Sequence, residues 1–302
     1  MNNTETMQKE KKRVAISSVI AALFLTGSKL VVGLMTGSLG LISEALHSGL
    51  DLIAAGITYL TVRVSDKPAD KSHHYGHGKL ENLSAFAQTI LLLVTCIWII
   101  YEATSRLITG NVDIDVNVWS FAVIIISIIV DISRSRALNR VAKKYNSQAL
   151  EADALHFSTD IWSSVVVLFG LICAKFGFYY GDPIAALGVA VIVLMVCYKL
   201  GKKAIDVLLD KAPTELDQVV RQTLNRFEEV KQYHSLKIRT AGADTFIKVN
   251  IHLEPTLSLQ EVHNICDKIE QEFEKIIPRC EIYLHAEPQS DDHTCSEKSD
   301  GL

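Results

Sequence analysis

The sequence predicts an α-helical membrane protein with six transmembrane helices, followed by a C-terminal α+β domain outside the membrane. Apolar stretches of about 20 residues, the length that crosses a bilayer, recur through the first two thirds of the chain. Hydropathy then falls after Asp210, where a proline and a helix-start signal open a segment of amphipathic patterns. A composition of 49% hydrophobic and 21% charged residues suits a membrane portion joined to a soluble one.

The expected spans follow one another closely: 14–36, 39–62, 83–108, 117–138, 149–175 and 181–207. The first span follows a basic segment and is too long for the core of a signal peptide, so we expect it to be retained. The predicted organisation is an N-terminal segment, a six-helix domain, a soluble α+β domain and a disordered tail, over residues 1–13, 14–208, 209–288 and 289–302.

The basic residues predict the orientation of the chain. Lysine and arginine gather in the N-terminal segment and in the connections after the second and fourth spans, whereas the opposite connections are short or acidic. By the positive-inside rule, both termini are expected in the cytoplasm. The net charge of −4 gives no indication of a nucleic-acid partner.

Two histidine–aspartate pairs interrupt the apolar spans. His47 and Asp51 lie in the second span, and His156 and Asp160 lie in the fifth. A spacing of four residues places both members of a pair on one helix face. Because an ionisable group at mid-membrane depth costs about 2.5–3.5 kcal/mol, such residues usually mark a functional site. The two pairs predict a tetrahedral site for a divalent cation, with a structural polar cluster as the alternative.

Other features of the spans have simpler interpretations. Asp131 lies three residues before Arg134 in the fourth span, which favours a local ion pair. The sequence has no H-E-x-x-H arrangement and no candidate nucleophile beside the histidines, so an intramembrane metalloenzyme is not supported. We therefore expect a protein that is not an enzyme.

A histidine-rich loop, DKPADKSHHYGHGKLEN, connects the second and third spans. Asp70, His73 and His77 can close around a cation, with two glycines allowing the backbone to turn. A solvated linker is the alternative interpretation.

The soluble segment predicts the order α-β-β-α-β, a small ferredoxin-like sheet with helices on one side. The expected elements are a helix at 215–230, strands at 234–241 and 244–255, a helix at 258–278 and a strand at 280–288. In the second strand, alternation places Ile247, Val249, Ile251 and Leu253 inward and Lys248, Asn250, His252 and Glu254 outward. The second helix opens with a capping-box pattern at Ser258 and Glu261 and is expected to bury Val262, Ile265, Ile269, Phe273 and Ile276.

This segment also carries a third set of candidate metal ligands: His234, His252, His263, His285 and Glu287. Imidazole and carboxylate suit zinc, although solvated surface histidines are the alternative. About 80 residues is a marginal size for an independent core, which indicates support from oligomerisation or bound metal.

These motifs, in this order, resemble the cation diffusion facilitator family over almost the whole chain. The shared features are six spans, paired ligands in the second and fifth, the loop GHGKLEN before the third, and a soluble domain ending in a His-x-acid-Pro strand. The resemblance implies a homodimeric exchanger of zinc and protons in the plasma membrane, the inner membrane of a bacterium.

The resemblance also implies roles for the three residue sets. The paired residues of the spans fall on the transport site, the loop residues on the loop metal site, and the soluble residues on the paired-metal site of the cytoplasmic domain, where zinc is expected to be structural or regulatory. Two positions depart from the family's best-described bacterial exchangers, which have aspartate where His47 and Glu287 stand. We expect export of Zn2+ from the cytoplasm coupled to proton entry, since imidazole must lose its proton to bind metal. The alternatives are Fe2+, Co2+, Cd2+ or Ni2+ as cargo, or a membrane-anchored metal sensor that moves no ion.

Overall fold

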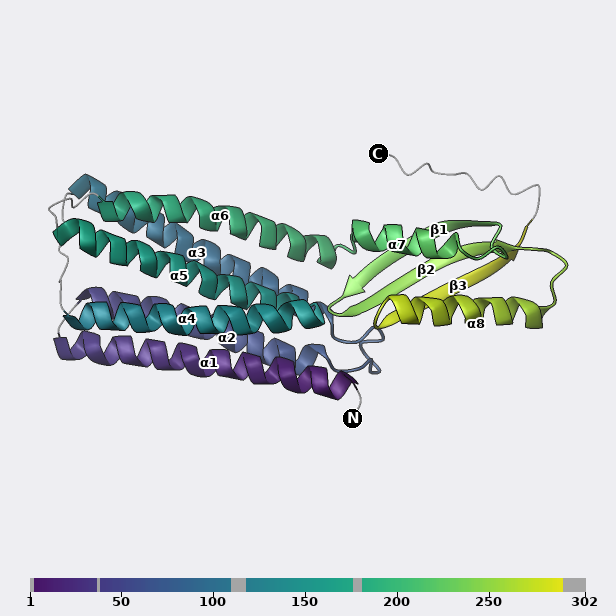
Figure 1. Cartoon of the computed structure of the whole chain (residues 1–302), viewed down its shortest axis with the longest axis horizontal. Helices are drawn as coiled ribbons and strands as arrows, with labels where there is room; N and C mark the ends of the chain where they lie inside the picture. Colours follow the sequence, from purple (N-terminus) through teal and green to yellow (C-terminus); the bar gives the residue numbers. More distant parts are fainter. Residues whose placement is uncertain (1–2, 37–38, 110–117, 176–180, 290–302) are drawn as a thin grey trace. The chain divides into compact units, whose positions relative to one another are not determined.

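The computed structural model describes residues 3–36, 39–109, 118–175 and 181–289 (Figure 1). The chain divides into two compact units, unit 1 over residues 1–208 and unit 2 over residues 209–302. Each unit has its own hydrophobic core, and we describe them separately.

Within its described residues, unit 1 is a bundle of long helices. They are α1 (Asn3–Thr36), α2 (Leu39–Ser65), α3 (Lys79–Thr109), α4 (Val118–Tyr145), α5 (Gln148–Lys175) and α6 (Gly181–Leu208). Each predicted span coincides with one of these helices, apart from residue 117, which lies outside the described residues. The structure extends α1 and α4 beyond the predicted spans, so the basic segments there are helical too.

Among the described residues, three helices are long and apolar enough to cross a membrane: Thr6–Met35, Lys79–Thr109 and Pro183–Leu208. Their large apolar side chains point outward rather than into the bundle. Examples exposed by more than half are Leu34, Met35, Ile97, Trp98, Ile192 and Met195. Such side chains would be costly in water and are expected where lipid replaces it. Unit 1 is thus a helical domain of the membrane type.

The helix packing brings the two histidine-bearing helices together. The most extensive contacts pair α1 with α2, α3 with α6, and α4 with α5. Helix α5 also contacts α2, α3 and α6, so it lies centrally in the bundle. The contact between α2 and α5 is the one that positions the predicted ligands.

A buried charge network joins three helices at the end of the bundle where α2 and α3 connect. The Lys11 ammonium is fully buried and lies 3.0 Å from Asp66 Oδ1 and 2.6 Å from Glu81 Oε1. The second Glu81 oxygen accepts a 2.5 Å hydrogen bond from Ser147, which precedes α5. The network satisfies a lysine and two carboxylates that would otherwise be expensive to bury.

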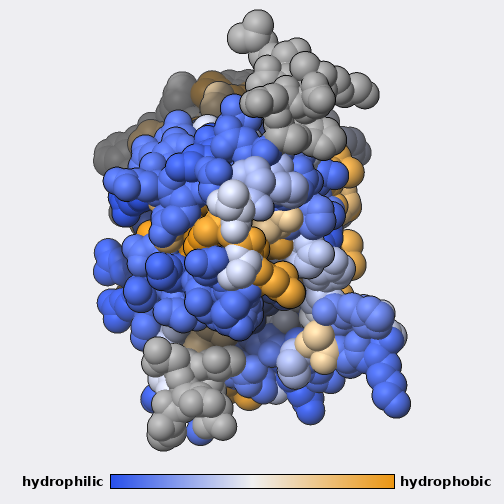
Figure 2. All heavy atoms as spheres, turned by 90° about the vertical axis from the view of Figure 1, so that its right-hand side faces the viewer, coloured by the Kyte–Doolittle hydropathy of each residue, from blue (hydrophilic) through white to orange (hydrophobic). Residues whose placement is uncertain are grey.

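Unit 2 has the predicted order of elements. It contains α7 (Thr214–Leu224), β1 (Gln232–Ala241), β2 (Asp244–Leu253), α8 (Leu259–Ile276) and β3 (Cys280–Pro288). The sheet order is β1-β2-β3, antiparallel between β1 and β2 and parallel between β2 and β3. Both helices contribute to one core cluster with the inward residues of β2, which leaves the other sheet face for polar side chains. The surface of unit 2 visible in Figure 2 is mainly hydrophilic.

The core of unit 2 confirms most of the sequence pattern and corrects one position. The alternation of β2 and the capping box at Ser258 are present, and α8 buries Ile265, Ile269 and Phe273. Ile276, predicted to be buried, is 37% exposed, and Ile277 is buried instead. The residue before Pro278 must leave the helical conformation, and Ile277 is extended, with φ −116° and ψ 104°. The helix therefore ends at Ile276, two residues before the expected end, and Ile277 enters the core.

Candidate metal sites

In unit 1, α2 and α5 bring three of the four predicted ligands together. Asp51 and His156 are buried, and their side chains share a 2.8 Å hydrogen bond between Nε2 and Oδ1. One ligand atom from each of Asp51, His156 and Asp160 lies within 4.8 Å of the others. Tetrahedral zinc separates its ligand atoms by about 3.3 Å, so small side-chain rotations would suffice to close this group on an ion. The side chain of His47, the fourth predicted ligand, lies outside the described part of the structure.

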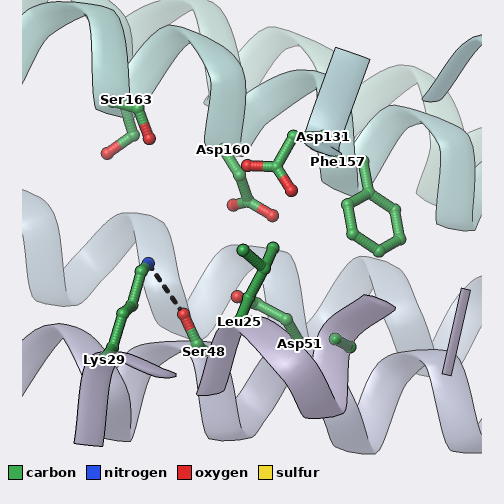
Figure 3. Close-up of a pocket in the computed structure, with 10 residues that line it drawn as sticks. Leu25, Lys29, Ser48, Asp51, Asp131, Phe157, Asp160 and Ser163 are labelled. Carbon is green, nitrogen blue, oxygen red and sulfur yellow. Dashed lines mark hydrogen bonds between the residues drawn. The ribbon is translucent and has the colours of Figure 1, made fainter. Parts of the chain in front are cut away.

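A small cavity opens beside these residues (Figure 3). Its volume is about 30 Å³, room for about two water-sized groups, and Asp51 and Asp160 line it. The remaining lining comes from α1, α2, α4 and α5, through Ala22, Leu25, Lys29, Ser48, Asp131, Phe157, Ser163 and Ser164. The cavity thus matches the size of a single ion with little of its water.

Two charged residues of this cavity were not foreseen as part of the site. Asp131 is buried and points into the cavity beside Asp160, whereas Arg134, its expected ion-pair partner, donates to Ser17 instead. Lys29 of α1 also lines the cavity and donates a 2.9 Å hydrogen bond to Ser48 Oγ. The site is therefore more highly charged than the two histidine–aspartate pairs imply.

The second nitrogen of His156, Nδ1, is buried. Among the described residues, His156 Nδ1 and Asp153 Oδ1 have no hydrogen-bond partner, and the two side chains interact electrostatically. The other Asp153 oxygen accepts a 3.0 Å bond from Ser18. A ligating imidazole is usually oriented by a carboxylate or carbonyl on its second nitrogen. No such bond joins Asp153 to His156 among the described residues, whereas the imidazole and the carboxylates of Asp51 and Asp160 are donors that suit a metal ion.

The loop between α2 and α3 forms a second group from Asp70, His73 and His77, whose ligand atoms lie within 4.8 Å of one another. Asp70 accepts hydrogen bonds from the backbone N–H groups of Ser72 and His73, and these hold the pKa of its carboxyl well below the usual range. Gly76 supplies the turn, with φ +72°. The loop is thus ordered around a carboxylate with two imidazoles nearby.

Unit 2 brings together three of its five candidates on the polar face of the sheet. Glu287 Oε2 lies 3.2 Å from His234 Nε2 and 3.6 Å from His252 Nε2. Asn250 donates a 2.8 Å hydrogen bond to the other Glu287 oxygen. The hydrogen bond from His234 lowers the pKa of Glu287, so the carboxylate is ready to bind a cation. His252 is on the predicted outward face yet only 6% exposed, because the His234 ring covers it.

Of the remaining two candidates, His263 lies on another element, and His285 contacts Glu287 from outside this group. His263 is on α8, and its side chain is 65% exposed and 3.6 Å from Asp267. His285 on β3 is 3.5 Å from Glu287 Oε1, on the side of the carboxylate that Asn250 occupies. The structure therefore supports His263 and His285 as metal ligands less strongly than His234 and His252.

We expect the carboxylates of Asp70 and Glu287 to stay ionised in mild acid. The pKa values of Asp70 and Glu287 are lowered in the folded protein. Their ionised carboxylates therefore contribute fully to folding stability at any pH above the ordinary pKa of the side chain. That contribution is lost only as pH falls through the lowered values, well under about pH 4. Carbon-detected NMR should therefore find both carboxylates ionised at about pH 5. Protonation of either near pH 6 would contradict this assignment.

Comparison with known proteins places this geometry in a family. The chain matches the cation efflux transmembrane domain over residues 15–209 and the cation efflux protein cytoplasmic domain over residues 212–289. The chain belongs to the cation diffusion facilitator family. It is accordingly a cation efflux transporter with a membrane domain and a cytoplasmic domain, and it is not an enzyme.

Relatives of this facilitator match it along nearly their whole length. The transporter MJ0449 of Methanocaldococcus jannaschii is 34% identical over 92% of this chain and 99% of its own. The cation-efflux pump FieF of Escherichia coli is 30% identical over 92% of this chain and 93% of its own. FieF of Pectobacterium atrosepticum is 29% identical over 91% and 92%. The family assignment leaves no support for a sensor that moves no ion.

Proposed function

We propose that the protein exports Zn2+ from the cytoplasm in exchange for protons. The observation that carries this proposal is the 2.8 Å hydrogen bond between His156 Nε2 and Asp51 Oδ1. Those two atoms share a proton, and both must be free of protons to bind a metal. Metal and proton therefore exclude each other at one place, which is the condition for coupled exchange. An inward proton gradient would then drive metal outward by alternating access.

The donor set favours zinc as the cargo. His47, Asp51, His156 and Asp160 would supply two imidazoles and two carboxylates, a combination that suits tetrahedral zinc. Magnesium and manganese prefer more oxygen ligands and six-coordination. Iron, cobalt, cadmium and nickel accept mixed nitrogen and oxygen ligands and are the alternative cargo.

The proposal includes a topology and an assembly. We place all six helices of unit 1 across the plasma membrane, with both termini in the cytoplasm, because the basic residues gather at one set of connections. The helices α2, α4 and α5 would cross beside α1, α3 and α6, whose described residues are long and apolar enough to span a membrane. We also propose a homodimer, since unit 2 is small and its own core is limited.

A metal panel in sealed vesicles tests the function. The purified full-length protein is reconstituted with an imposed pH gradient, and uptake of Zn2+, Fe2+, Co2+, Cd2+, Ni2+ and Mn2+ is compared. We expect zinc to move fastest and an ionophore that collapses the gradient to stop net uptake. Faster transport of another metal would replace zinc as the cargo. Zinc flux that is indifferent to the gradient would overturn proton coupling.

We propose that zinc at His234, His252 and Glu287 strengthens the dimer instead of travelling through the protein. Metal that binds only one arrangement of two subunits stabilises that arrangement by its binding energy. The loop group at Asp70, His73 and His77 is proposed as an additional zinc site near the entrance to the transport path.

In unit 2, replacing His252 with alanine should weaken zinc binding more than replacing His263. The first change removes a buried imidazole 3.6 Å from Glu287, and the second removes an exposed ring paired with Asp267. Zinc titration of the full-length protein, with dimer fraction measured by analytical ultracentrifugation, distinguishes the variants. Equal losses would mean that all five candidates act as one group. Loss of transport in the His252 variant as complete as in a transport-site variant would contradict a separate regulatory role.

A further inference from the structure

Lys29 is an unexpected charge in an apolar helix. It lies on α1 among outward-facing aliphatic residues, yet its side chain turns into the bundle and is only 8% exposed. Its ammonium lines the cavity of about 30 Å³ and donates to Ser48 Oγ at 2.9 Å (Figure 3). A buried lysine is costly unless nearby negative charge compensates it.

That negative charge comes from three carboxylates around the same cavity. Asp51 from α2, Asp131 from α4 and Asp160 from α5 all line it, and Asp160 interacts electrostatically with the other two and with Lys29. Figure 3 shows the Asp131 and Asp160 side chains next to each other and directed into the space. With all four groups ionised, the three carboxylates and one ammonium that line the cavity carry a net charge of −2. A single divalent cation neutralises them.

We propose that Lys29 and Asp131 set the affinity of the transport site for its divalent cargo as an opposed pair of charges. The inference rests on the proposed function. Neither residue is needed as a ligand: Asp131 adds attraction for the cation, and Lys29 subtracts from it. Three carboxylates without the ammonium would hold a divalent ion with one excess negative charge. Like charges at short range in a poorly screened cavity repel strongly, so Lys29 makes release of the metal possible.

Substitution of Lys29 tests the sign of this effect. In the full-length protein, Lys29→Met should bind zinc more tightly by at least about tenfold. Transport should show a lower KM and a lower kcat, because release becomes slower. Asp131→Asn should weaken zinc binding by a comparable factor. The double variant Lys29→Met/Asp131→Asn should return close to the affinity of the unmodified protein.

The controls separate charge from structure. Lys29→Arg keeps the charge and should keep the affinity within a few-fold. Lys203→Met removes one positive charge from the exposed pair with Glu151, where both side chains are more than a third exposed, and should leave zinc affinity unchanged. A lysine with a purely structural role would give weaker binding in Lys29→Met and no compensation in the double variant, and either result would overturn the inference. If the unmodified protein bound and moved no divalent metal, the proposed function itself would fail, whatever Lys29 does.

Discussion

Replacing Asp160 or Asp51 with alanine should reduce zinc flux by at least about 100-fold while leaving the protein folded in the membrane. Each change removes one of the predicted ligands and also one of the carboxylates that line the cavity. The buried site offers few water molecules to take the place of the missing oxygen, so the ion would be under-coordinated. The measurement is initial zinc uptake into vesicles that contain equal amounts of each variant.

A matched substitution makes this result specific. Glu151→Ala also removes a carboxylate from α5, but Glu151 is at the surface and pairs with Lys203 at 2.6 Å. It should transport zinc at a rate close to that of the unmodified protein. Near-normal flux in both Asp51→Ala and Asp160→Ala would show that cargo binds elsewhere. Melting temperatures in detergent establish whether a loss of flux reflects misfolding.

The second large effect concerns stability. Lys11→Met should lower the free energy of unfolding by about 3–5 kcal/mol, because it leaves Asp66 and Glu81 as buried carboxylates without their cation. Denaturation in mixed micelles, followed by tryptophan fluorescence, measures the change.

The control for this experiment is Lys144→Met on α4. Lys144 also forms a short ion pair, at 2.6 Å from Glu10, but its side chain is 54% exposed. Such a surface pair contributes about 0–1 kcal/mol, so this variant should differ little from the original. Similar losses in the free energy of unfolding for the two substitutions would mean that burial does not make the Lys11 network more stabilising than a surface ion pair.

The periodic features of the fold could be predicted from the sequence. The length of the apolar stretches predicted the helices of unit 1, and the alternation of apolar and polar residues predicted the buried residues of β2. Both patterns depend only on the spacing of residues close together in the sequence. Ile276 was misplaced because helical spacing continues through it, whereas the chain turns before Pro278. Glu81 was read only as part of a loop motif, and its near-complete burial depends on Lys11, 70 residues away.

The candidate transport site was only partly predictable for the same reason. In each histidine–aspartate pair, the spacing of four residues places both side chains on one face of their helix. The structure brings three of these four residues together. Lys29 on α1 and Asp131 on α4 belong to no spacing motif, so the direction of their side chains depends on how four helices pack. His234 and His252 likewise lie on different strands, and the register of β1 and β2, with its irregularity after His234, determines their approach.

If the cargo binds in the cavity of unit 1, we expect the small volume of this cavity to select metals by how readily they lose water, as well as by affinity. A space of about 30 Å³ has room for about two water-sized groups, so we expect the cargo to lose most of its hydration shell as it enters. Magnesium gives up its water reluctantly, and its abundance in the cytoplasm would otherwise make it the main competitor. We therefore expect the rate at which each metal exchanges water to influence which ion enters, in addition to the affinity of the ligands for it.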